Sequence, residues 1–501
     1  MPQYSRRIAC WLGFVLVGLI LGCGGSEKSD SRPKQQTKKR QTKKRQTSPR
    51  KPKQPKKKSP QVTMGQQGKQ KSSTVPSTQQ KKQTPVVRQL DGGVGPQLNA
   101  NRAAAAGIRV IQGKYLTLYT DLPTAADVDE LPKVFAAALP QWCKYFKLDV
   151  KQISRWKPTA YIIKDKARFQ GVGVLRPGLP PFRNGFQIKN EFWIYEQPSP
   201  YYRRHLLLHE GTHAFMDRFL GGTGPPWYME GIAEFLGTHR WQNGKLQLAF
   251  NPTSREQVPR WARVRLAKDA YKNGLGRSLD QIFSYGSSAH LRVEPYAWCW
   301  AAVTFLSRHP KYTARFDELR QRVNQGEGLT EHLRDRLDPD WAHAVREWQL
   351  YVANMEYGYD IARSAIEYKP TQPIGVGKDV SLKLKVARGW QSTGIRLARG
   401  QEVELAASGR FQLVAKPKKW MSEPGGVTIR YYRGQPLGKL LAAVCDESAV
   451  ETMTPLAKPK PIGLKGSLTA GQAGTLFLKI NDSAAELADN VGTVSVVVRA
   501  K

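Results

Sequence analysis

The sequence contains few cysteines: there are five in 501 residues, and no two of them form a Cys-x-x-Cys pair. Cys10 lies in the N-terminal apolar run and Cys23 follows it, which leaves Cys143, Cys299 and Cys445 for the folded part of the chain. Three scattered thiols predict neither a disulfide framework nor a thiolate metal centre. At most one disulfide is expected.

Long apolar runs are also scarce. The N-terminal run, residues 8–22, is shorter than the roughly 20 apolar residues that a helix needs to cross a bilayer. Arg6 and Arg7 precede it, as in an export signal. Its end, "GLILGCGG", resembles the lipobox of bacterial lipoproteins. The resemblance implies a lipoprotein signal peptide over residues 1–22 and a lipid on Cys23 that anchors the protein to a membrane of the bacterial cell envelope. A plain secretory signal is the alternative.

Acidic residues are about half as numerous as basic ones, with 40 Asp and Glu against 79 Lys and Arg, a formal charge of +39. Residues 26–94 hold 20 of these bases, a tandem QTKKR repeat and almost no large apolar side chain. Such a segment cannot bury enough surface to offset the entropy of ordering, so we expect a disordered basic tether over residues 23–104. Nucleic acid is an alternative partner for a basic run, but an exported protein would not meet it. We interpret the tether as a solvated spacer.

Periodicity predicts a mixed α+β domain over residues 105–360. "KYLTLYTD", "TAYIIKD" and "EFWIYEQ" have the composition of strands, and residues 127–148 repeat apolar residues at helical spacing. The last strand ends shortly before "HLLLHEGTHAFMDRF", residues 205–219. We therefore expect a small mixed sheet with this helix packed on it, followed by a mainly helical half.

The helix at 205–219 contains a His-Glu-x-x-His motif. On a helix, His209 and His213 lie about 40° apart and one turn along the axis, so both imidazoles can reach one metal ion. Catalytic zinc takes three protein ligands and keeps one position for water. Glu210 projects beside that position, where a carboxylate can take a proton from the water. An ordinary amphipathic helix is the competing interpretation.

A second motif, "WYMEGIAEFLG", follows a "GGTGPP" turn. Glu230 begins a helix that can fold back and bring a third ligand to the metal. Glu234, four residues later on the same face, can hydrogen-bond the free ring nitrogen of a ligand histidine. Two exposed glutamates on an amphipathic helix are the alternative, but the apolar neighbours of Glu230 disfavour full exposure.

"HEGTH" followed by "WYMEGIAEF" resembles the gluzincin metallopeptidases, and in particular their membrane-alanyl-aminopeptidase branch. The resemblance implies that His209, His213 and Glu230 bind Zn²⁺ and that Glu210 is the general base. "EPYAWCWAAVTFL" resembles the family helix whose tyrosine steadies the oxyanion, which implies this role for Tyr296. A tyrosine packed in the core is the alternative.

The chain departs from the aminopeptidases at one point, because the Gly-x-Met-Glu-Asn segment that binds a free amino group is absent from "NGFQIKNEFWIYEQ". The order of elements is more similar to the gluzincin-like domains of bacterial envelope proteins. This likeness implies a thermolysin-like fold over roughly residues 110–355.

After a predicted linker at residues 361–380, short alternating runs separated by Gly, Pro, Asp and Asn predict an antiparallel β-sandwich over residues 381–501. This part resembles the galactose-binding sandwich of a small family of calcium-dependent bacterial lectins. The resemblance implies Ca²⁺ and sugar ligands at Asn481, Asp482, Asp489 and Asn490, whose oxygens suit Ca²⁺. The same residue types also favour loops without any ion.

The sequence therefore predicts a lipid-anchored, extracytoplasmic zinc metallopeptidase that hydrolyses a peptide or cell-wall amide, with carbohydrate as a further partner of the sandwich. A non-enzymatic adhesin that binds carbohydrate and retains a degenerate peptidase scaffold is the alternative.

Overall fold

The computed structural model describes residues 98–450 and 453–501, except for the side chains of residues 290 and 291. The predicted signal peptide, Cys23 and the tether up to residue 97 lie outside the described residues. Folded structure begins earlier than predicted, with helix α1 (Ala100–Ala105), whose first turn is capped by the Asn99 side chain. Leu98 and Ala103 are buried against the sheet, so residues 98–104 belong to the domain and not to the tether. Within the described residues, no helix is long and apolar enough to span a membrane.

The first part of the domain is a five-stranded mixed sheet in the order β1-β2-β3-β5-β4. The central strands β2, β3 and β5 run parallel, whereas β1 and β4 pair antiparallel at the two edges. The strand bounds are β1 (Arg109–Gln112), β2 (Thr117–Thr120), β3 (Thr159–Ile163), β4 (Gly185–Ile188) and β5 (Glu191–Tyr195). The predicted mixed sheet is confirmed, and β3 is buried at four of its five positions, as expected for a central parallel strand.

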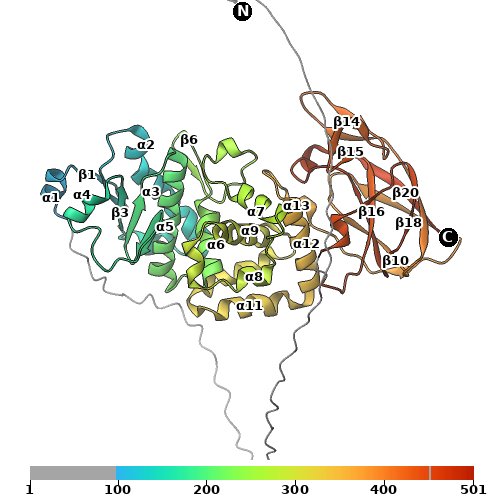
Figure 1. The fold of residues 1–501 in the computed structure, drawn as a ribbon, viewed down its shortest axis with the longest axis horizontal. Helices are drawn as coiled ribbons and strands as arrows, with labels where there is room; N and C mark the ends of the chain where they lie inside the picture. The colour runs from blue at the N-terminus through green and yellow to red at the C-terminus, as the bar shows by residue number, and fades with distance from the viewer. Residues whose placement is uncertain (1–97, 451–452) are drawn as a thin grey trace, which may run out of the picture. The chain divides into compact units, whose positions relative to one another are not determined.

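Helices make up most of the remainder of this domain, so the predicted mixture of α and β structure is confirmed. Figure 1 shows α5 between the strands of the sheet and the helices α6 and α9. The helix bounds are α2 (Ala126–Asp129), α3 (Leu131–Phe146), α4 (Lys166–Gly171), α5 (Pro200–Leu220), α6 (Pro226–Gly237), α7 (Arg263–Lys272), α8 (Leu279–Phe283), α9 (Glu294–Arg308), α10 (Thr313–Asp317), α11 (Gly328–Leu337), α12 (Trp341–Ala353) and α13 (Ile361–Ser364). A short hairpin, β6 (Arg240–Gln242) and β7 (Lys245–Gln247), follows α6.

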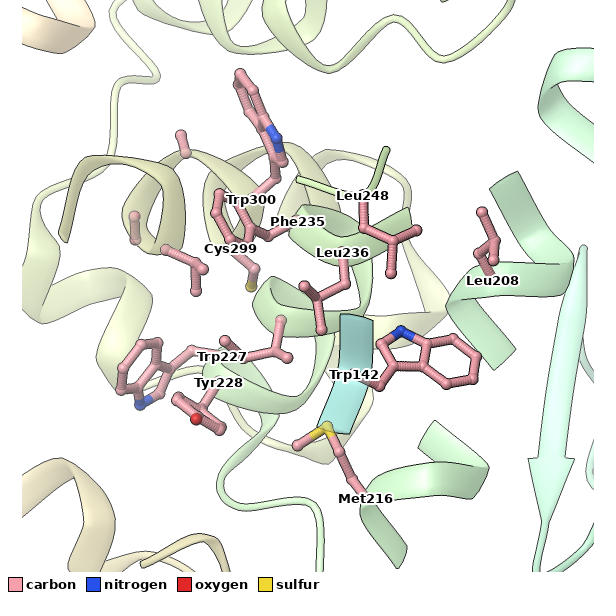
Figure 2. Close-up of a cluster of buried hydrophobic side chains, with 14 of the residues drawn as sticks. Trp142, Leu208, Met216, Trp227, Tyr228, Phe235, Leu236, Leu248, Cys299 and Trp300 are labelled. Carbon is pink, nitrogen blue, oxygen red and sulfur yellow. The ribbon is translucent and has the colours of Figure 1, made fainter. Parts of the chain in front are cut away.

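Two glycines let the helices around α5 approach closely. A Cβ at Gly211 of α5 would lie 2.7 Å from the Phe135 ring and 2.9 Å from the Trp142 ring of α3. A Cβ at Gly231 of α6 would lie 2.5 Å from a methyl carbon of Val303 in α9. Figure 2 shows the core between these helices, with Trp142 beside side chains of α5 and α6. The glycines thus set how deeply α5 and α6 are buried.

The C-terminal part is β-rich, as predicted. Its two larger sheets have the orders β17-β16-β19-β10-β8 and β18-β11-β20-β9, and their facing sides share one hydrophobic core. The strand bounds are β8 (Gln372–Pro373), β9 (Asp379–Lys385), β10 (Gln391–Leu397), β11 (Glu402–Ser408), β12 (Phe411–Val414), β13 (Trp420–Ser422), β14 (Val427–Tyr432), β15 (Gln435–Leu437), β16 (Leu440–Cys445), β17 (Lys460–Pro461), β18 (Lys465–Thr469), β19 (Gly474–Ile480) and β20 (Thr493–Ala500).

The predicted linker at residues 361–380 is partly built into folded structure. It contains α13 and strand β8, which pairs parallel with β10. Ile374 is buried in the sandwich core, so the sandwich begins before its predicted start at residue 381. Cys143, Cys299 and Cys445 are all buried.

Candidate metal centre

Helix α5 places the His-Glu-x-x-His motif in the interior of the domain. Ser199 caps its N-terminus by accepting a hydrogen bond from the Tyr202 N–H, and Pro200 occupies the first turn. Gly221, with φ 71°, ends the helix in the left-handed conformation. All residues from His205 to Met216 are buried, including both motif histidines and Glu210. Buried polar side chains of this kind need partners.

The structure brings His209, His213 and Glu230 together. The Nε2 atoms of the two histidines are 3.1 Å apart, and Glu230 Oε2 lies 3.1 Å from His209 Nε2 and 3.5 Å from His213 Nε2. Tetrahedral zinc with bonds of 2.0–2.1 Å holds its ligand atoms about 3.3–3.4 Å from one another. The three atoms therefore form a triangle of the size that one zinc ion requires.

The chemistry of the donor set fits a cation as well. Glu230 Oε2 is buried and has no hydrogen-bond partner, and the same holds for His213 Nδ1. Although burial acts to raise it, the close contacts with the His209 and His213 imidazoles lower the pKa of Glu230 to about 2. The carboxylate is thus anionic at neutral pH and pairs with two imidazoles whose nitrogens converge on one point. Within the described part of the chain, clusters of His, Cys, Asp or Glu able to hold a metal occur only on α5 and α6.

Glu234 lies behind this triangle, at the centre of a buried network. Its Oε1 is 3.4 Å from His209 Nδ1, and Arg263 donates to both of its oxygens at 2.7 and 2.8 Å. His205 Nε2 lies 3.3 Å from Glu234 Oε2, and His205 Nδ1 lies 2.9 Å from the Gly237 carbonyl oxygen. Burial opposes ionisation, but the Arg263 guanidinium holds the pKa of Glu234 well below its usual range. A charged Glu234 held by Arg263 is placed to orient the His209 ring.

Glu210 lies against the edge strand β4. A Cβ at Gly185 would lie 2.2 Å from Glu210 Oε1, so the β4 backbone touches this carboxylate directly. Burial raises the pKa of Glu210. Gly185 and Glu210 line the same cleft, which has a volume of about 310 Å³.

Tyr296 lines this cleft from the first turn of α9. Its ring centroid is 5.9 Å from that of His209, and the side chain is half-buried. Burial and the nearby Glu230 and Glu210 carboxylates raise the pKa of Tyr296, so the hydroxyl keeps its proton at neutral pH. The residue predicted from the resemblance therefore lies beside His209, although it is 83 positions from His213 in the chain.

The four residues proposed as calcium or sugar ligands lie elsewhere, and they bond to the protein itself. The Asn481 amide donates to three backbone carbonyls, each at 3.0 Å. Asp482 and Asn490 are joined by a 2.8 Å hydrogen bond, and burial raises the pKa of Asp482 to about 6. Asp489 accepts a hydrogen bond from the Ala415 N–H at 3.1 Å. These contacts hold the loop after β19 in place.

Three residues of the site were not predicted from the sequence. His205 precedes His209 by four residues, and this spacing, which places both side chains on one face of the helix, could have pointed to it. Arg263 is 29 positions from Glu234 and Gly185 is 25 positions before Glu210, and neither belongs to a local pattern that points to the motif. Only the packing of β4 on α5 and of α7 on α9 brings them to the site.

No protein-family model matches the chain, and no curated protein matches it. Among solved structures, the chain is similar to the EclA N-terminal domain, a PllA-like lectin, at 23% identity over 24% of this chain and 95% of that domain, with a TM-score of 0.19. It is also similar to IMPa from Pseudomonas aeruginosa in complex with an O-glycopeptide, at 14% identity over 78% of this chain and 42% of that one, with a TM-score of 0.14. The chain spans less than half of that second structure.

Proposed function

We propose that the chain is a gluzincin-type zinc metallopeptidase, which hydrolyses an amide bond of a peptide or of a cell-wall polymer. The observation that supports this most directly is the triangle of His209 Nε2, His213 Nε2 and Glu230 Oε2, with sides of 3.1 to 3.5 Å. A structural zinc site would use four protein ligands, whereas three ligands beside a cleft leave one position for water.

A zinc ion held by these three residues would act as a Lewis acid toward water and a substrate carbonyl. Glu210 takes the proton from the attacking water and delivers it to the leaving amine. Burial suits the carboxylate to this role, because a raised pKa brings it closer to the pH at which it must both accept and donate. Tyr296 keeps its proton and donates a hydrogen bond to the oxyanion that develops on the carbonyl oxygen.

Strand β4 is a free edge of the sheet beside the cleft, since its pairing partner in the described sheet is β5 alone. An extended peptide can add to such an edge through backbone hydrogen bonds. The glycine at position 185 lets this backbone approach Glu210, so a peptide along β4 would present its carbonyl near the catalytic carboxylate.

The test is metal content together with hydrolysis of casein and of cell-wall muropeptides by the purified full chain. We expect one zinc per chain by mass spectrometry, loss of zinc in His213→Ala, and loss of hydrolysis with retained zinc in Glu210→Gln. The half-buried His332 and the exposed Glu256 provide matched controls, so His332→Ala and Glu256→Gln should behave like the unmodified protein. A purified chain without zinc, or full activity in Glu210→Gln, would contradict the proposal.

We also propose that Cys23 is lipidated and anchors the enzyme in the cell envelope, as the lipobox-like "GLILGCGG" indicates. Metabolic labelling with palmitate should mark the unmodified protein and not Cys23→Ser. If the zinc site binds metal but no amide is cleaved, the carbohydrate-binding adhesin becomes the better interpretation, and binding to a glycan array would test it.

A further inference from the structure

The cleft beside Glu210 contains three arginines, and they differ in their partners. Arg263 is buried and its charge is neutralised by Glu234. Arg183 and Arg292 also line the cleft but are exposed, and no acidic side chain of the described residues forms an ion pair with either of them. The cleft thus presents two cationic side chains that no acid of the described protein neutralises.

Other arginines around this site form ion pairs with acidic side chains. Arg176, in the same loop as Arg183, lies 3.6 Å from Glu191, and Arg204 lies 3.2 Å from Glu130. The acids that share the cleft with Arg183 and Arg292 have other roles, because Glu210 is the proposed base and Glu234 is held by Arg263 and His209. The two arginines therefore remain available to a ligand.

Their positions link them to the reacting groups. Arg183 precedes Gly185, whose backbone contacts Glu210, by two residues on the sheet side of the cleft. Arg292 is four residues before Tyr296 and comes from the helical half. A volume of about 310 Å³ is at the lower end of the range for ligand pockets, so the cleft holds a short segment of substrate and both arginines act close to the scissile bond.

We propose, on the basis of the peptidase function above, that Arg183 and Arg292 select substrates with a carboxylate next to the cleaved amide. A guanidinium presents a planar pair of N–H donors that matches a carboxylate, and it stays protonated at any physiological pH. The carboxylate is supplied either by an acidic side chain or by the free C-terminus of the peptide. The first source predicts cleavage within acidic peptides and the second predicts removal of C-terminal residues.

The experiment uses the full chain carrying Glu210→Gln and loaded with zinc, so that binding is measured without turnover. Three short peptide libraries are offered to the immobilised protein: one with a fixed glutamate and an amidated C-terminus, one with glutamine in its place, and one with glutamine and a free C-terminus. We expect one carboxylate library to be enriched about tenfold over the neutral library, which corresponds to one good charge-assisted contact. The library that is enriched identifies the source of the carboxylate.

Arg183→Gln and Arg292→Gln together should reduce this enrichment to within about twofold. Arg322→Gln is the matched control, since Arg322 is exposed and lines a separate hollow near α10, and it should leave the enrichment unchanged. Equal retention of all three libraries, or an enrichment that survives the double substitution, would overturn the assignment. Because the readout is binding, this result is independent of whether the unmodified protein hydrolyses any amide, which the zinc and activity measurements decide.

Discussion

Replacement of Gly185 by alanine should impair catalysis without removing the metal. The new Cβ would lie 2.2 Å from Glu210 Oε1, 2.8 Å from its Cδ and 3.0 Å from its Cγ. Ordinary van der Waals contact begins at 3.4 Å, so the carboxylate oxygen must move by about 1.2 Å, the difference between 3.4 and 2.2 Å. The displaced group is the end of a flexible side chain, so the fold should tolerate the change. A displacement of about 1 Å in a catalytic group can cost on the order of 10²-fold in rate.

The assay for Gly185→Ala compares kcat/KM, zinc per chain and thermal midpoint with those of the unmodified protein. We expect kcat/KM to fall on the order of 10²-fold while zinc content stays at one per chain and the thermal midpoint changes little. Gly171→Ala is the control, because a Cβ at the end of α4 meets nothing within 4 Å. Unchanged kcat/KM in Gly185→Ala would refute the placement of the Glu210 carboxylate against β4, and loss of zinc would show that the strand supports the metal ligands instead.

Further predictions concern the oxyanion, the buried network, pH and the metal. Tyr296→Phe should lower kcat on the order of 10²-fold with zinc retained, because it removes one hydrogen-bond donor to the oxyanion. Steady-state kinetics measure the change in kcat. Arg263→Met removes the guanidinium partner of the buried Glu234 carboxylate and should cost about 3–5 kcal/mol in urea unfolding of the metal-free protein, part of which the added Glu234→Gln restores. Burial lowers the pKa of His239 from 6.5 to about 3, so between pH 6.5 and 3 the unfolded chain binds a proton that the folded chain does not. Stability therefore falls as the pH is lowered through this range. His239→Gln should make the urea midpoint decline less steeply with falling pH. If the proposed site holds zinc, chelation should lower the thermal midpoint and added zinc should restore it, because an ion that binds only the folded state stabilises that state.

The sequence alone determined the parts of the site that depend on local geometry. The spacing of His209 and His213 places both rings on one face of any α-helix, and the apolar neighbours of Glu230 indicated burial. The alternating runs after residue 380 likewise predicted a β-rich C-terminal part. The start of the fold was placed too late, because "LNANRAAAAGI" has too few large apolar residues to show a period, and α1 depends on Leu98 and Ala103 packing on the sheet.

Tertiary structure decided everything that depends on how separate elements pack. Glu230 reaches 3.1 Å from His209 because Gly211 and Gly231 let α3, α5, α6 and α9 approach closely, and no helical period encodes such a distance. Arg263 reaches Glu234 from α7, and nothing in the sequence distinguishes it from the many other basic residues of this chain. The contact between Gly185 and Glu210 joins an edge strand to the motif helix. Such long-range contacts arise from side-chain volumes across the whole core, which a linear pattern does not record.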